Sequence, residues 1–174
     1  MLKSVEDAQL LLESLDAPIR LLTHLRLVGE AADLLIQKLE ALGVGIDAEL
    51  VRLGAAVHDA GKIIHPAELS GEGNLHERAG EELLLSHDVQ SEIARCCVSH
   101  ARYETMKVSL EELLVALSDK LWKGKREENL ELRVIDEAAM RLGKDRWDVF
   151  SELDSCFEKI ASDGESRLAR SKVS

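Results

Sequence analysis

No stretch of the chain alternates apolar and polar residues for long enough to predict a β-strand. One helical stripe instead repeats at the spacing of a buried helix face, through Leu21, Val28, Ala31 and Leu35. Helices are predicted over 18–42, 47–61, 76–85, 89–101, 127–142 and 146–169, with another opening at Ser109 and a short first one near Ser4. The longest predicted loop covers 63–74. The pattern therefore predicts an all-α bundle of about seven helices.

Capping residues support these boundaries. Ser109 and Glu112 form a capping box, and Asp47 is placed to cap the helix that follows it. Asp88 is likewise expected to cap the helix over 89–101. Each of these residues offers a side-chain oxygen to main-chain N–H groups that the first turn of a helix leaves without partners.

The composition agrees with a globular helical protein. The 174 residues suffice for a single domain with its own core, expected over 1–174. Hydrophobic residues make up 45% and charged residues 32%, but aromatic residues only 3%. The core must therefore consist mainly of leucine, valine, isoleucine and alanine, which favours packed helices over a β-sandwich.

The charge and the cysteines restrict the partners and the compartment. A formal net charge of -11 argues against long nucleic acid, because proteins that bind it gain affinity by neutralising phosphates. None of the three cysteines forms a CxxC spacing, so neither a disulfide nor a zinc–thiolate site is expected. No apolar run reaches the length of a membrane span, and the N-terminus lacks the order of a signal peptide. We expect a cytoplasmic protein that does not enter a membrane.

The candidate chemistry centres on a His-Asp pair. All six histidines lie between His24 and His100, and His58 is followed directly by Asp59. Neighbouring side chains on a helix point about 100° apart, but at a helix end both can reach one ion. Small residues surround the pair in LGAAVHDAGK, so other helices can approach closely. Imidazole and carboxylate together suit divalent transition metals such as Fe, Mn, Co, Ni or Zn.

Two further residues place a polar side chain on a helix face that should be buried. His24 lies on the apolar stripe of its helix, and Asp119 shares a face with Val115, Ala116 and Trp122. A buried histidine needs a polar partner or a metal, and an unpaired buried carboxylate is costly. Both positions therefore predict a metal ion or a charged partner.

The order of these residues resembles the HD superfamily of metal-dependent phosphohydrolases, whose metal is held by a histidine, a His-Asp pair and a distant aspartate. The resemblance covers about 24–126 and implies an HD-domain bundle with a ligand-bearing core over about 18–126 and C-terminal helices over about 127–170. HDAGK resembles the form of the motif in which the lysine, here Lys62, lies near the substrate phosphate. The four matching ligand positions are His24, His58, Asp59 and Asp119.

Two more histidines resemble the dinuclear subgroup of this superfamily. His76, in NLHERAGEEL, stands where that subgroup has a histidine opening a helix, and His100, in CCVSHARY, stands where the next helix ends in one. SLEELLVALSDKLWKGKR is similar to the aspartate-containing helix and basic turn of the bacterial HD-type dinucleoside tetraphosphate hydrolases. Similarity to the cyclic-dinucleotide phosphodiesterases stops earlier, because no GYP tripeptide follows His100.

The resemblance implies two divalent ions and a metal-activated hydroxide that attacks a small phosphorylated metabolite, a nucleotide or dinucleotide. Asp59 is expected to bridge the ions, and Lys62 to neutralise charge on the phosphoryl group, which makes these two the expected catalytic residues. The other ligands divide into His24, His58 and Asp119 for one ion and His76 and His100 for the other. The residues expected to bind substrate are Lys62, Arg78, Lys123 and Arg126.

Some of the candidate residues and the function also have alternative interpretations. His87 begins a second His-Asp pair, but we expect it outside the metal site because the next residue is needed as a cap. His65 is either a substrate contact or a solvated loop residue, and Arg102 either a phosphate contact or an ordinary surface arginine. Two other functions stay open: a di-iron oxygenase on the same ligand set, and a regulatory HD module without turnover. The oligomeric state is also open.

Overall fold

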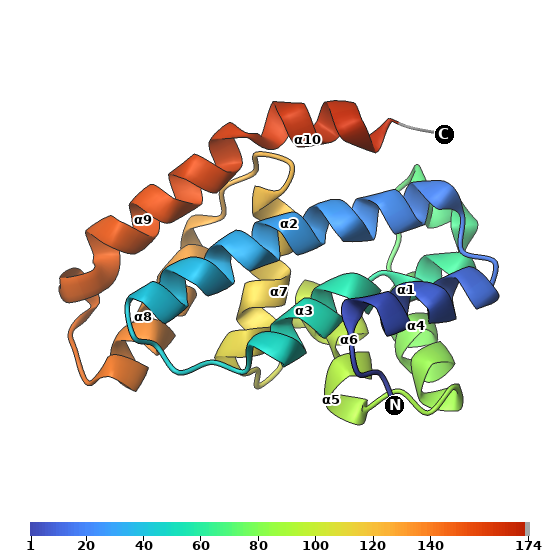
Figure 1. The fold of residues 1–174 in the computed structure, drawn as a ribbon, viewed down its shortest axis with the longest axis horizontal. Coiled ribbons are helices and arrows are strands. Elements are labelled where there is room, and N and C mark those ends of the chain that lie inside the picture. The colour runs from blue at the N-terminus through green and yellow to red at the C-terminus, as the bar shows by residue number, and fades with distance from the viewer. Residues whose placement is uncertain (173–174) are drawn as a thin grey trace.

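The computed structural model describes residues 1–172, and over that range the chain is helical without a β-strand (Figure 1). The predicted all-α class is confirmed. Two short 3₁₀ helices, η1 (Ala60–Ile63) and η2 (Pro66–Leu69), lie among the α-helices. The α-helices are α1 (Val5–Ser14), α2 (Ile19–Ala41), α3 (Ala48–Val57), α4 (Leu75–Ser86), α5 (Ser91–Ala94), α6 (Cys96–Arg102), α7 (Leu110–Leu121), α8 (Glu128–Leu142), α9 (Arg146–Ser162) and α10 (Gly164–Ser171).

Several helices begin at the caps that the sequence predicts. Asp47 accepts the main-chain N–H of Leu50 at 3.0 Å at the start of α3. At the start of α7, the Ser109 hydroxyl accepts the N–H of Glu112 at 3.2 Å, and the Glu112 carboxylate accepts the N–H of Ser109 at 2.8 Å. These local bonds fix where the helices that carry the candidate ligands begin.

Three predicted helices are interrupted. The one expected over 47–61 ends at Val57, after which the chain passes into η1. The one expected over 89–101 is divided at Arg95, and the one over 146–169 at Asp163. Only the last two interruptions divide one predicted helix into two α-helices, and residues 1–172 contain ten α-helical segments where about seven were predicted.

The prediction that Asp88 caps a helix is wrong. Asp88 has a φ of 59°, in the left-handed region, and lies in the turn between α4 and α5. The helix starts at Ser91, after Gln90. Short polar residues such as aspartate tolerate this backbone conformation, so Asp88 serves the turn that ends α4.

The longest helix, α2, runs across the molecule, and several other helices pack against it (Figure 1). Helices α9 and α10 lie along one side of it, while α3 and α7 pack against it. A large apolar core joins α2, α3, α7, α8 and α9, with Leu35, Leu114, Val134 and Phe157 fully buried. In residues 1–172, no helix has both the length and the apolar character of a membrane span.

A second, smaller core lies near the N-terminal half of α2. It joins α1, α2, the last turn of α3, α4 and α6 through buried residues that include Leu12, Leu21, Val57, Leu84 and Cys97. Four of these elements carry or directly precede candidate ligands. The packing of this core therefore brings His24, the His-Asp pair, His76 and His100 to one place.

Gly61 shows how closely η1 approaches α4. A Cβ atom at this position would lie 1.8 Å from the main-chain oxygen of His76 and 2.7 Å from the main-chain nitrogen of Gly80. No side chain larger than hydrogen fits without moving η1 away from α4. The glycine of HDAGK is thus a steric requirement for placing Lys62 and His76 beside the His-Asp pair.

Replacing Gly61 with alanine is expected to destabilise the fold by about 1–3 kcal/mol, because main-chain atoms must move. Thermal unfolding should show a fall in Tm of roughly 2–12 °C. Gly45→Ala is the matched control, since nothing lies within 4 Å of a Cβ there. Equal Tm values for the two variants would show that η1 and α4 are not in close contact.

Candidate metal centre

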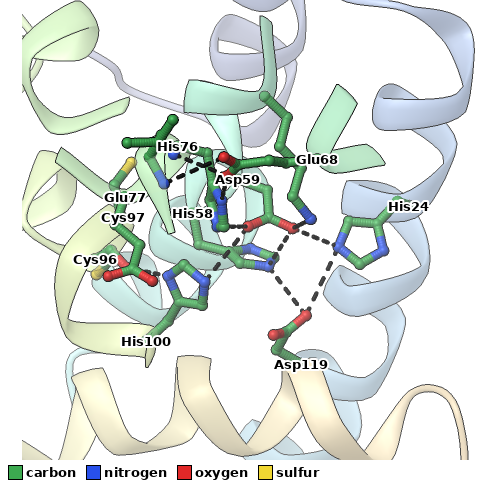
Figure 2. Close-up of polar contacts among 12 residues, drawn as sticks. His24, His58, Asp59, Glu68, His76, Glu77, Cys96, Cys97, His100 and Asp119 are labelled. Atoms are coloured by element: carbon green, nitrogen blue, oxygen red, sulfur yellow. Dashed lines mark hydrogen bonds and ion pairs between the residues drawn. The ribbon is translucent and has the colours of Figure 1, made fainter. Parts of the chain in front are cut away.

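Six side chains from five elements converge at one place in the bundle (Figure 2). Helix α2 contributes a histidine from its second turn, and the end of α3 contributes the His-Asp pair. Helices α4 and α6 contribute one histidine each, and the last turn of α7 contributes an aspartate. These residues are His24, His58, Asp59, His76, His100 and Asp119.

Asp59 lies at the centre and is 2% exposed. Its Oδ2 is 3.0 Å from His24 Nε2 and 3.6 Å from His58 Nε2. Its Oδ1 is 3.3 Å from His76 Nε2 and 3.4 Å from His100 Nε2. The two carboxylate oxygens therefore face two different groups of imidazoles.

The six residues form two sets that share Asp59, and within each set the ligand atoms lie within 4.8 Å of one another. Asp119 completes the first set, because its Oδ1 is 3.2 Å from His58 Nε2 and 3.7 Å from His24 Nε2. One set is His24, His58, Asp59 and Asp119; the other is Asp59, His76 and His100. The structure thus brings together the residues that the resemblance implied as ligands, in the implied grouping.

Main-chain carbonyls orient two of the imidazoles. His58 Nδ1 is 2.8 Å from the carbonyl oxygen of Ala55, and His100 Nδ1 is 2.9 Å from that of Cys96. A carbonyl only accepts, so each Nδ1 carries a hydrogen and each Nε2 faces the cluster, where it can offer a lone pair to an ion once it is deprotonated. This is the arrangement that metal-ligating histidines commonly show.

Glu68 is a member of this site that the sequence did not identify. Its Oε1 lies 2.6 Å from His76 Nδ1. His76 is therefore the third imidazole of the cluster, after His58 and His100, whose ring has an orienting partner. Glu68 lies in the loop over 63–74, on η2, where it is one of two acidic residues and gave no periodic or capping signal. Its position between the His-Asp pair and His76 was the only hint available.

The charges in the cluster stabilise one another. Burial would raise the pKa of the Asp59 carboxyl, but His58 and the other imidazoles hold it well below its ordinary value. Burial also opposes ionisation of Asp119, yet His58 lowers the pKa of that carboxyl to about 2. Burial disfavours a charged His58, but the carboxylates of Asp59 and Asp119 raise its pKa to about 9. The cluster therefore combines two anionic groups with at least one bound proton that a cation can displace.

The donor set fits divalent transition metals. Ligand atoms that share an ion at about 2.1 Å lie roughly 3–3.5 Å apart, and most of the distances in each set are close to this range. Four imidazoles and two carboxylates suit Fe, Mn, Co, Ni or Zn. Neither set contains a cysteine, so the cluster is not a thiolate site. The described cysteines are free, and Cys96 and Cys97 are core thiols.

Lys62 lies beside the cluster. Its Nζ is 2.9 Å from Asp59 Oδ2, and 18% of its side chain is exposed. Arg78 and Lys123, which were expected to bind substrate, are both exposed, on α4 and directly after the end of α7. His65 directly precedes η2, makes no capping bond with its side chain, and is half-buried.

Arg126 requires a correction. Its guanidinium donates to the carboxylates of Glu131, Asp154 and Glu158, with N–O distances between 2.6 and 3.2 Å. These ion pairs, with Glu131 the largest contributor, raise the pKa of Arg126. A guanidinium with three carboxylate partners joins the turn after α7 to α8 and α9, so we assign it a structural role instead of substrate binding.

Arg102 and His87 lie outside the ligand cluster, in ordinary surface roles. Arg102 donates to the buried carboxylate of Glu77 at 2.6 Å and ties α6 to α4. His87 is exposed at the end of α4, where its Nδ1 lies 3.0 Å from the carbonyl oxygen of Leu83. Neither belongs to the two ligand sets.

Comparison with protein families matches residues 21–138, which is more than half of the chain, to the HD domain. The chain belongs to the HD family. No curated protein and no solved structure matches it. The narrower similarity to the dinucleoside tetraphosphate hydrolases therefore has no support from these comparisons. The matched HD region contains both ligand sets, and its central motif is the buried pair His58 and Asp59.

Alanine at Asp59 is expected to remove both ions, because its two oxygens belong to both ligand sets of this HD domain. His24→Ala should mainly weaken the first ion, and His76→Ala only the second. Metal analysis after dialysis against Mn²⁺ and then buffer measures the ions per chain, and circular dichroism checks the fold. His87→Ala is the control and should keep wild-type metal content. Equal metal in wild type and Asp59→Ala would contradict the assignment.

Metal affinity of the HD centre is expected to rise with pH. His58 has a raised pKa of about 9, so its bound proton competes with the ion below that pH and is released when the ion binds. Each unit of pH between about 6.5 and 9 should tighten the first ion by up to tenfold. Titrations with Mn²⁺ at pH 6.5, 7.5 and 8.5 measure this slope. An affinity that is constant over these values would show that His58 carries no competing proton.

Proposed function

We propose that this HD protein is a metal-dependent phosphohydrolase that acts on a small phosphorylated metabolite, a nucleotide or dinucleotide. The observation that carries the proposal is the position of Asp59, which directs one oxygen into each ligand set while Lys62 contacts the same carboxylate. Many HD proteins are metal-dependent phosphohydrolases, and the ligand residues that such an activity requires are all present here.

The ligand side chains differ in their exposure to solvent, and this difference indicates from which side a substrate would approach the cluster. The side chains of His24 and Asp119 are each 19% exposed, while those of His76, His100 and His58 are 9% exposed or less. A phosphoryl group therefore reaches the cluster from the side of His24, Asp119 and Lys62. Divalent ions bound there would supply Lewis acidity and a hydroxide nucleophile near neutral pH.

Lys62 is the residue of the chain that we assign to the phosphoryl group. Its ammonium group, 2.9 Å from Asp59 Oδ2 and partly exposed, is positioned to balance negative charge that develops on the phosphoryl oxygens. The aliphatic part of the side chain extends from η1, which Gly61 holds tightly against α4. Lys62 thus extends from a segment that packs closely against α4, which favours the fixed position that an electrostatic contribution to catalysis requires.

The charge distribution favours a small substrate. The whole chain carries a formal net charge of -11, which repels a long polyanion. Lys120 and Lys123 lie at the end of α7 close to Asp119 in sequence, so they raise the local potential near the cluster. Such a local patch can attract a few phosphates of a nucleotide or dinucleotide but cannot follow an extended backbone.

A screen of the metal-loaded protein against nucleotides, dinucleotides and sugar phosphates, with oligonucleotides alongside, tests the proposal directly. Lys62→Ala is expected to lower kcat by roughly 100-fold while the metal content stays near the wild-type value, since the ammonium group acts on charge that develops in the reaction. Lys144→Ala is the matched control for loss of an exposed positive charge. Faster cleavage of oligonucleotides than of any small compound, or oxygen consumption without phosphate release, would contradict the proposal.

A further inference from the structure

The carboxylate of Glu68 accepts three hydrogen bonds although it comes from a loop. Oε1 accepts the main-chain N–H of His76 at 3.1 Å and its ring Nδ1–H at 2.6 Å, and Oε2 accepts the N–H of Leu75 at 3.3 Å. The side chain is only 9% exposed. Figure 2 shows Glu68 beside His76 and Asp59 on the side of the cluster away from Asp119.

Two of these bonds cap α4 from outside the helix. Asn74 precedes the helix but makes no capping bond with its side chain. Leu75 and His76 are the first two residues of α4, and their N–H groups have no partners inside the helix. The anionic side chain of Glu68 satisfies both and lies at the positive end of the helix dipole. Glu68 thus fixes the start of the helix that carries His76.

The third bond sets the orientation of a ligand ring. Since a carboxylate accepts, His76 Nδ1 carries the hydrogen, and Nε2 points to Asp59 Oδ1 at 3.3 Å. His58 and His100 are oriented by carbonyls of their own helical turns. His76 differs because its orienting partner lies eight residues earlier, in a separate loop.

The loop over 63–74 closes tightly on this carboxylate. A Cβ atom at Gly73 would lie 2.5 Å from Glu68 Cδ and 2.5 Å from Oε2, so the backbone at Gly73 passes directly against the carboxylate. Glu68 therefore has little room to turn away from His76 while the loop keeps this path. The loop, the start of α4 and the His76 ring form one connected unit.

We propose that Glu68 is a positioning residue for the ion held by Asp59, His76 and His100, and that it couples the 63–74 loop to that ion. Residues that hold a ligand imidazole in place commonly contribute 10- to 100-fold to metal affinity. The inference rests on the metal binding in the proposed function but not on hydrolysis. The other ligand set, which shares only Asp59 with this one, would hold its ion without a contact to Glu68.

The test compares Glu68→Ala, Glu68→Gln and wild type in calorimetric titrations of the metal-free protein with Mn²⁺, without substrate. Glu68→Ala is expected to weaken the second ion by about 10- to 100-fold and to leave the first nearly unchanged. Glu68→Gln should recover part of the loss, because its amide oxygen can still accept a bond from His76. Asp47→Ala, which removes the cap of α3 without touching the cluster, is the matched control for stability.

Two independent signals separate the ions. Trp122 packs edge-on against His24, with ring centroids 5.0 Å apart, while Trp147 is 72% exposed, so a change in the buried tryptophan fluorescence reports the first ion. That signal should keep its wild-type midpoint in both Glu68 variants. Hydrogen exchange should show that the second ion protects the amides of Leu75 and His76 in wild type and no longer does so in Glu68→Ala.

Three outcomes would overturn the inference. The first is an unchanged second ion in Glu68→Ala, and the second is equal weakening of both ions. The third is a wild-type protein that binds only one ion per chain. Each of these is read from metal binding alone, so a protein that binds two ions normally but hydrolyses no phosphate would refute the proposed function and leave the role of Glu68 standing.

Discussion

The structure depends on the burial of one carboxylate. Asp59 is almost inaccessible to solvent, and an isolated carboxylate in such a place would cost several kcal/mol. Four imidazoles and the ammonium group of Lys62 surround it, and three of the imidazoles, those of His24, His76 and His100, come from segments distant in sequence. Satisfying this single charge requires α2, α3, α4 and α6 to meet at one place. The same requirement that determines the packing around Asp59 therefore also creates the donor set for metal.

Several contacts around Asp59 allow these helices to approach one another. Close approach of η1 to α4 is possible only because Gly61 lacks a side chain, and main-chain carbonyls and Glu68 turn the rings of His58, His100 and His76 toward the carboxylate. Trp122 packs edge-on against the ring of His24. The C-terminal helices act at a greater distance, through the core and through Arg126, which joins the turn after α7 to α8 and α9.

Local signals in the sequence predicted most of the fold, because capping residues and apolar stripes act over a few positions. The sequence also indicated the ligands, since His24 and Asp119 lie on faces that had to be buried. What it did not predict depends on contacts between distant segments. Arg126 finds Asp154 only after α9 has folded back, and Glu68 reaches His76 only through the path of its loop. Asp88 itself adopts the left-handed conformation in the turn that follows α4, and the periodicity of the sequence does not encode this.

The central proposal is that Asp59 would hold two ions, because each of its carboxylate oxygens faces a different ligand set. A crystal structure of the protein prepared with Mn²⁺, with anomalous scattering measured at the manganese edge, tests it most directly. The account predicts two anomalous peaks about 3.5–4 Å apart, one contacted by His24, His58 and Asp119 and the other by His76 and His100, with Asp59 touching both. A single peak with His76 and His100 free of metal would contradict it.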